Sequence, residues 1–204
     1  MRQKPQDRKE APAFNIHPYK IMLNMSLLGI SSLFIGFTVA YMMSSTVTWK
    51  WADFAFPKLF LVSTILIVLS SYTIHRAIKS YKSSQEANLK KWFLITMVLS
   101  VGFVVTQVLG WMELTQEGIM LDGTPDGGYL YVISGIHALH VLAGLIPLIW
   151  FLVLTYRKLA NPVDSLLFFT ESRYKLKFEM LERYWHFVDL LWVYLLFFFL
   201  FNHL

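Results

Sequence analysis

The chain has 204 residues, of which 56% are hydrophobic and 15% are charged, and its formal net charge is +5. This composition is typical of a membrane protein rather than a soluble one. Cysteine is absent, which excludes disulfides, iron–sulfur clusters, and copper or zinc held by thiolates.

Membrane-spanning helices are the main elements that the sequence predicts. A helix needs about 20 apolar residues to cross the hydrocarbon core of a bilayer. The apolar stretches are continuous rather than alternating, which argues against a barrel of strands. We therefore predict an all-α, polytopic membrane protein with a polar cytoplasmic tail and one five-helix membrane domain. The tail covers residues 1–20, the domain covers residues 21–204, and the helices cover about 21–45, 56–77, 92–113, 129–156 and 184–204.

Basic residues show which side of the membrane each connection faces. Sixteen of the 18 Lys and Arg residues lie in the tail, in the second connection or in the fourth connection. The other connections hold only Lys50 and Lys58. Because positively charged loops stay in the cytoplasm, we predict a cytoplasmic N-terminus and a periplasmic C-terminus. The positive charge is then explained by topology, and no nucleic-acid partner is expected.

The predicted outer loop after the third span is acidic. Its sequence, ELTQEGIMLDGTPDGGY, contains four acids and no base, with glycine and proline typical of turns. Such a loop would attract a basic periplasmic partner such as a cytochrome c. The sequence favours the simpler interpretation, a solvated surface loop.

Small residues spaced four apart are expected to mark the contacts between helices. Helices in lipid associate by close packing and by hydrogen bonds between helices. The first span has Ser32, Gly36 and Ala40 at this spacing. Stripes of small residues are also predicted on the other spans, at Gly102, Thr106 and Gly110, at Ser63, Ser70 and Ser71, and at Gly135, Ala143 and Gly144.

Two histidines in the fourth predicted helix lie three residues apart, at His137 and His140. They share one helix face. They could ligate a metal or a haem, but such sites usually take donors from several helices. We expect them instead to form hydrogen bonds between helices, and the metal role remains the alternative.

His186 and Asp189 form a second polar pair, near the start of the last predicted helix. A charge in the middle of a membrane helix costs about 2.5–3.5 kcal/mol on insertion scales. Asp189 should therefore face the bundle and accept a hydrogen bond, from His186 or from a neighbouring helix. A static structural bridge is favoured over a proton relay. Gln107 is expected to lie on the same face of its helix as Gly110, toward a contact with a neighbouring helix.

Two motifs in this chain resemble a known family, the subunit III family of the haem–copper oxidases. RYWHFVDLLWVYL, residues 183–195, resembles the signature of that family's last helix. SGIHALHVLAG, residues 134–144, resembles its G-x-H-x-x-H-V motif. DGGY at residues 126–129, Phe178 with Glu179, and SSYTIHRA at residues 70–77 also fall where members carry similar residues.

The resemblance implies a non-catalytic subunit III of a proton-pumping cytochrome c oxidase, in the bacterial five-helix form that lacks two N-terminal helices. It implies direct packing on subunit I, proximity to subunit II, bound phospholipid, and support of proton uptake and of turnover lifetime. Haem and copper would lie in the partner subunits, not in this chain. The expected location is the bacterial cytoplasmic (inner) membrane, with a cytochrome c or a respiratory supercomplex as further candidate partners. The expected structural or lipid-linked residues are Gln107, His137, His140, Glu179, His186 and Asp189.

Two positions depart from the family pattern. Many members carry a buried Glu three residues after a Gln, but here Gly110 follows Gln107, and Glu113 comes one turn later. The acid that many members carry after a Ser in the first helix is also missing, because Ser31 and Ser32 stand there. A role of these acids in proton uptake therefore does not carry over to this chain.

Two other functions remain open from the sequence. A quinol oxidase subunit III would share both motifs. A membrane electron carrier could bind haem through the four histidines of the predicted spans, His75, His137, His140 and His186.

Overall fold

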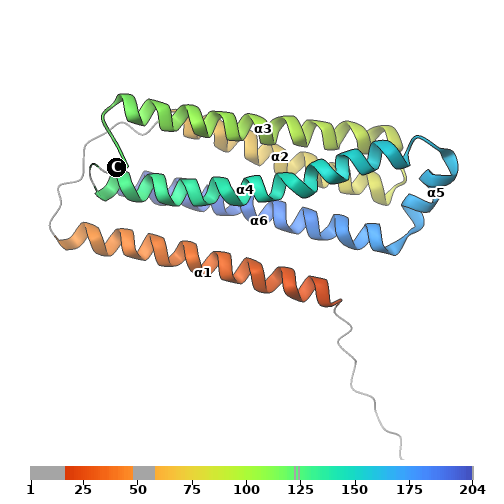
Figure 1. The fold of residues 1–204 in the computed structure, drawn as a ribbon, viewed down its shortest axis with the longest axis horizontal. Helices are drawn as coiled ribbons and strands as arrows, with labels where there is room; N and C mark the ends of the chain where they lie inside the picture. Colours follow the sequence, from red (N-terminus) through yellow and green to blue (C-terminus); the bar gives the residue numbers. More distant parts are fainter. Residues whose placement is uncertain (1–16, 48–57, 122, 124, 204) are drawn as a thin grey trace, which may run out of the picture.

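The computed structural model describes residues 17–47, 58–121, 123 and 125–203, and all of its regular structure is helical (Figure 1). Five of its helices are long and apolar enough to cross a membrane, as the sequence predicts. The α5 helix is too short to do so. The helices are α1 (Pro18–Val47), α2 (Lys58–Lys82), α3 (Glu86–Gln116), α4 (Pro125–Lys158), α5 (Pro162–Thr170) and α6 (Ser172–His203).

Each of the five long helices extends beyond its predicted span at one end or both, while residues 56, 57 and 204 of the predicted spans lie outside the described residues. The last helix begins at Ser172 rather than near Tyr184, and the third begins at Glu86 rather than near Trp92. The difference arises because the apolar criterion detects only the part of a helix that lies in hydrocarbon. Residues 18–20, assigned to the tail from the sequence, belong to α1. The first sixteen residues of the predicted tail lie outside the described residues.

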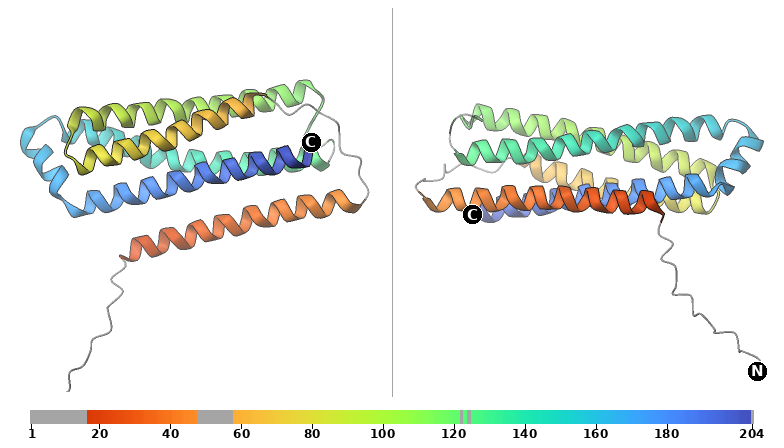
Figure 2. Two further views of the ribbon diagram at one scale, coloured as in Figure 1. Left: turned by 180° about the vertical axis from the view of Figure 1, so that it is seen from behind. Right: turned by 60° about the horizontal axis from the view of Figure 1, so that its bottom comes forward.

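Four helices form the bundle in the cyclic order α2, α3, α4 and α6, with each helix contacting the next. The α1 helix lies outside this ring and contacts only α4 and α6 substantially, as Figures 1 and 2 show. It is the least buried of the five long helices, because only 11% of its apolar segment is buried inside the protein. Most of the surface of α1 is therefore available to lipid or to another protein.

Aromatic residues fill the bundle at the end where α5 lies. Phe178 of α6 packs between Tyr81 of α2 and Phe151 of α4, at ring-centroid distances of 4.4 and 4.5 Å. The Tyr81 hydroxyl donates a hydrogen bond of 2.7 Å to the carbonyl of Phe168, in α5. The α5 helix thus closes this end of the bundle.

Of the three small residues predicted to mark a helix contact on α1, only Ala40 is partly buried in the described part of the chain. Ser32 and Gly36 are exposed, and a Cβ added at Gly36 would meet no atom within 4 Å. The prediction was wrong because spacing shows which residues share a face, but not whether that face has a partner in the same chain. Two glycines of the other predicted stripes do lie close to a neighbouring helix: Gly110 against Phe60 of α2, and Gly144 against Tyr184 of α6.

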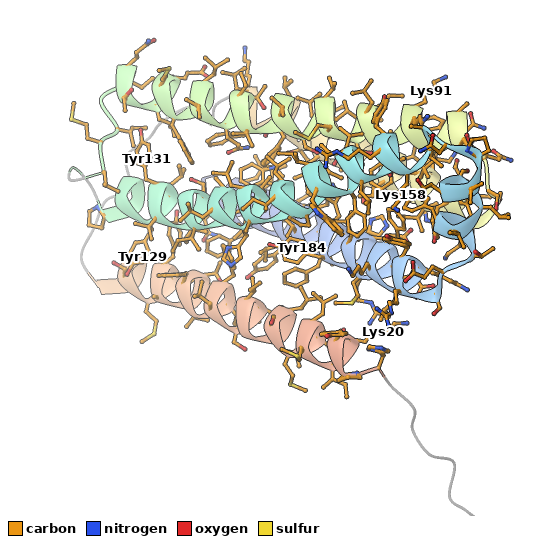
Figure 3. The ribbon with its side chains drawn as sticks, turned by 45° about the vertical axis from the view of Figure 1, so that its right-hand side comes forward. Lys20, Lys91, Tyr129, Tyr131, Lys158 and Tyr184 are labelled. Carbon is orange, nitrogen blue, oxygen red and sulfur yellow. The ribbon has the colours of Figure 1, made fainter. Side chains whose placement is uncertain are left out.

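Basic side chains gather at one end of the bundle. Figure 3 shows Lys20, Lys91 and Lys158 near one end, and Tyr129 with Tyr131 near the other. Lysines from the predicted tail and from the two connections that are rich in Lys and Arg in the sequence thus meet at the same end of the bundle. The orientation of the termini relative to the membrane remains a prediction.

Candidate functional site: the polar seam between α2 and α6

The α2/α6 polar seam is a row of hydrogen bonds that joins the second and last long helices. It consists of four pairs, each with one residue from each helix. The α6 members are three, four or seven residues apart from a neighbour in the row, spacings that place them on one helix face. The pairs are Trp192 Nε1 to Thr64 Oγ1 at 2.9 Å, Trp185 Nε1 to Ser70 Oγ at 3.0 Å, His186 Nδ1 with Ser71 Oγ at 2.5 Å, and His75 Nδ1 with Glu182 Oε1 at 2.8 Å.

The energy of the seam comes from several moderate contributions. A hydrogen bond between membrane helices contributes about 0.6 kcal/mol on average and about 1.7 kcal/mol at most. The four pairs together therefore contribute about 2–3 kcal/mol, if the average is taken for each. Breaking one pair would also leave a polar group without its partner in a largely apolar environment. The seam consequently fixes the register of α6 against α2.

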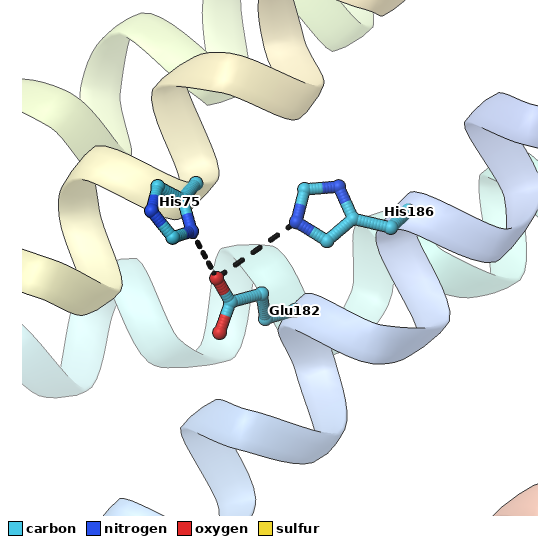
Figure 4. A group of neighbouring side chains, drawn as sticks. All are labelled: His75, Glu182 and His186. Atoms are coloured by element: carbon cyan, nitrogen blue, oxygen red, sulfur yellow. Dashed lines mark hydrogen bonds and ion pairs between the residues drawn. The ribbon is translucent and has the colours of Figure 1, made fainter.

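One end of the seam holds a cluster of three ionisable side chains, His75, Glu182 and His186, which we call the His–Glu–His cluster (Figure 4). Glu182 Oε1 lies 2.8 Å from His75 Nδ1 and 3.8 Å from His186 Nε2. The Glu182 side chain is largely buried, whereas the two imidazoles are 60% and 41% exposed. One carboxylate thus interacts with two imidazoles on different helices.

Asp189 is buried in the bundle as expected, but it does not bridge to His186. Its exposed fraction is 4%, and neither carboxylate oxygen has a hydrogen-bond partner among the described residues. Ser71 faces Asp189, yet its hydroxyl makes its hydrogen bond with His186. The predicted His186–Asp189 bridge is therefore wrong, because His186 is turned toward α2.

The two histidines of α4 also differ from expectation. His137 is fully buried among the rings of Phe34, Phe103 and Trp192, with centroids 6.4, 5.9 and 5.1 Å away, and neither of its nitrogens has a partner in the described part of the chain. His140 Nδ1 bonds to the carbonyl of Ile136 in its own helix, at 2.8 Å. The expected bonds between helices are therefore not formed by these imidazoles.

Gln107 and Gly110 both face α2. Gln107 Nε2 donates a hydrogen bond of 2.8 Å to Ser63 Oγ. A Cβ added at Gly110 would lie 2.5 Å from Cε1 of Phe60. Phe60 therefore fills the space that a side chain at Gly110 would need. Glu113 is only partly buried, one turn further along α3.

Glu179 ties α6 to α1. Its Oε2 lies 3.1 Å from Lys20 Nζ, and both side chains are about one-third exposed. One turn further along α6, Arg183 donates a hydrogen bond of 3.0 Å to Asn24 Oδ1. Tyr194 and Thr38 share a third polar contact, at 2.9 Å. These three contacts hold α1 along the outside of the bundle.

Sequence reasoning did not single out Glu182 or Trp185 for the seam. Glu182 follows a run of basic residues and reads as a solvated charge. Its position four residues before His186 was the available signal, since residues at i and i+4 share a helix face. The indole of Trp185 was treated as part of a family motif, although its N–H requires a partner when buried.

The arrangement suits a structural role. The seam supplies hydroxyls, indoles, imidazoles and one carboxylate, all oriented by contacts between helices. In the haem-carrier alternative, an iron would need free imidazoles facing one another. Instead, the Glu182 carboxylate lies between His75 and His186, and aromatic rings surround His137.

Comparison with known proteins gives the same family along nearly the whole chain. The family model described as cytochrome c oxidase subunit III matches residues 19–203. A probable cytochrome c oxidase subunit 3 from Nocardia farcinica is 28% identical over 67% of this chain and 62% of its own length. A cytochrome c oxidase subunit 3 from Synechocystis is 29% identical, over 90% of this chain and 76% of the relative.

A quinol oxidase subunit 3 from Bacillus spizizenii is also similar, with 25% identity over 92% of this chain and 87% of the relative. The match to the Nocardia protein spans only about three-fifths of that relative.

Proposed function

Since this chain belongs to the cytochrome c oxidase subunit III family, we propose that it is the non-catalytic subunit III of a proton-pumping terminal oxidase. In this role it binds directly to subunit I, lies near subunit II, and supports proton uptake and turnover lifetime. Haem and copper belong to the partner subunits. Subunit II, which receives the electrons, determines whether cytochrome c or quinol is the donor, and we propose cytochrome c.

The observation that carries this proposal is the family match, which extends over all five long helices. The motif residues have structural roles that suit a scaffold. Trp185 and His186 bind α2 through Ser70 and Ser71. The polar groups of the last helix therefore serve to hold helices in place, and none of these contacts requires a redox centre.

The proposed location is the bacterial cytoplasmic membrane, with the N-terminus inside. The five membrane-spanning helices and the similarity to oxidase subunits support this location. Lys20, Lys91 and Lys158 then lie at the cytoplasmic end (Figure 3). The acidic loop before α4 lies on the periplasmic side, where a basic cytochrome c or another member of a supercomplex would approach.

A groove between α1, α4 and α6 is the proposed phospholipid site. It has a volume of about 460 Å³ and is lined mainly by apolar residues, including Leu23, Pro147 and Met180. Lys177 also lines it, with its ammonium group 5.1 Å from the centroid of the Trp150 ring. An acyl chain fits the apolar wall, and Lys177 supplies the charge that a lipid phosphate requires.

The decisive experiment is purification of the tagged chain in a mild detergent. We expect subunits with haem and copper to co-purify, and oxygen to be consumed with reduced cytochrome c. Oxygen consumption with quinol alone would assign the chain to a quinol oxidase, the type named for the Bacillus relative. Recovery of the chain alone, with a haem absorption band of its own, would contradict the proposal and support the haem-carrier alternative.

The supporting role is tested by comparing the oxidase with and without this chain. We expect the incomplete oxidase to take up protons more slowly and to lose activity after fewer turnovers. Equal turnover lifetimes would show that the chain does not protect the catalytic subunit.

A further inference from the structure

The His–Glu–His cluster offers a second kind of chemistry beyond that of a scaffold. We propose that His75, Glu182 and His186 bind a divalent transition-metal ion such as Zn²⁺, which would link α2 to α6. The ion is distinct from the haem and copper of the partner subunits. The proposal does not depend on the function proposed above, because all three ligands belong to this chain.

The ligand set has the composition of a known type of zinc site. Two imidazoles and one carboxylate, with water in the fourth position, form a tetrahedral site with one open position. Nitrogen and oxygen ligands lie about 2.0–2.1 Å from zinc, so neighbouring ligand atoms in a tetrahedron are about 3.3 Å apart. Such a site needs the three donor atoms close together before the ion arrives.

The distances in the cluster are near these values. One donor atom from each of the three residues lies within 4.8 Å of the others. The Glu182–His186 separation is 3.8 Å and the Glu182–His75 separation is 2.8 Å. Side-chain movements of about 1 Å would therefore bring the donors to tetrahedral spacing, without moving either helix.

Ser71 orients one of the ligands. Its hydroxyl lies 2.5 Å from Nδ1 of His186, on the side of the ring away from Glu182. A hydrogen bond at one imidazole nitrogen fixes the tautomer and leaves the other nitrogen to bind the metal. The nitrogen that faces Glu182 is Nε2, so the contact with Ser71 presents the correct atom to the ion.

Neighbouring positive charges are directed away from the cluster. Arg76 lies next to His75 in sequence, but its guanidinium is 5.3 Å from the Trp92 ring centroid of α3 and 5.9 Å from that of Tyr72. Arg183 follows Glu182, and its guanidinium bonds to Asn24 of α1. Among the described residues, the ion pairs of Glu182 are those with the two imidazoles. The carboxylate is therefore available to a cation.

Access is also suitable. The His75 side chain is 60% exposed and that of His186 is 41% exposed, whereas Glu182 is 16% exposed. An ion would approach past the imidazoles and reach the carboxylate behind them. The alternative for the same geometry is a hydrogen-bonded network without metal, in which Glu182 simply holds both imidazoles.

The test uses the tagged chain together with whatever subunits co-purify, after treatment with a chelator. Equilibrium dialysis against radioactive Zn²⁺ then gives bound zinc per chain. His75→Gln is the key variant, because glutamine can still donate a hydrogen bond to Glu182 but is a poor zinc ligand. His17→Gln is the matched control, since His17 is an exposed imidazole outside the cluster.

We expect the wild type and His17→Gln to bind one more zinc ion per chain than His75→Gln and Glu182→Gln. Ser71→Ala should keep the site but weaken it by about 10–100-fold, because it removes the partner that orients a ligand. Equal zinc binding by the wild type, His75→Gln and Glu182→Gln would overturn the proposal. Bound zinc per chain tests the metal site, whereas co-purified haem tests the assignment to an oxidase. The two proposals can therefore fail independently.

Discussion

Replacing Gly110 by Ala tests the close contact between α3 and α2. An ideal Cβ at this position would lie 2.5, 2.9 and 3.4 Å from Cε1, Cδ1 and Cζ of Phe60. Carbon atoms pack best at about 3.5–4.0 Å, so the ring would have to retreat by about 1 Å. Phe60 is 1% exposed, and its ring lies edge-on to Trp192, at 5.8 Å between centroids. The ring therefore has little room to move.

The expected loss of stability follows from two opposing contributions. Overpacking a buried site costs about 1–3 kcal/mol. Ala is favoured over Gly inside a helix by about 0.5–1 kcal/mol. The net loss expected for Gly110→Ala is thus about 1 kcal/mol, with an upper value near 2 kcal/mol. Gly36→Ala is the control, because its Cβ would meet nothing within 4 Å, and it should leave stability unchanged or slightly higher.

The assay is reversible unfolding of the full chain in mixed micelles of mild detergent and dodecyl sulfate, followed by circular dichroism. Phe60→Leu added to Gly110→Ala should recover part of the loss, which would show direct coupling of the two sites. If Gly110→Ala is as stable as Gly36→Ala, the close approach of α2 to α3 does not exist as described.

Three further predictions use the same unfolding assay. Trp185→Phe removes the donor to Ser70 Oγ and should cost about 0.5–1.5 kcal/mol; no loss would exclude that bond. A double-mutant cycle on Lys20 and Glu179 should give a coupling below about 1 kcal/mol, since both side chains are partly exposed. Asp189→Asn should change stability by less than about 1 kcal/mol, because neither carboxylate oxygen has a hydrogen-bond partner among the described residues; a larger loss would reveal a partner outside them.

The sequence predicts the helices better than their partners. Continuous apolar stretches located all five long helices, because hydrophobic length is a local property. The α5 helix was missed, since nine residues beginning at Pro162 read as part of a connection. Most helix ends were predicted too close to the middle of the helix, because polar turns outside the hydrocarbon carry no apolar signal.

Contacts between helices were hard to predict for a different reason. The partner of His186 is Ser71, 115 residues away, rather than Asp189 three residues away. Periodicity shows which residues share a face, but the rotation of each helix depends on all its neighbours. The stripe on α1 failed for the same reason, since Ser32 and Gly36 lie on an exposed face of α1 among the described residues.

The α2/α6 polar seam has a consequence for biosynthesis. The ribosome completes α2 well before it makes α6, so Ser70, Ser71 and His75 enter the bilayer without the partners they have in the finished protein. A chain that stalls before α6 would present this polar face to lipid, where unsatisfied groups are costly. Such unfinished chains should be degraded by membrane proteases. Once α6 is inserted and pairs with α2, the chain should resist this degradation.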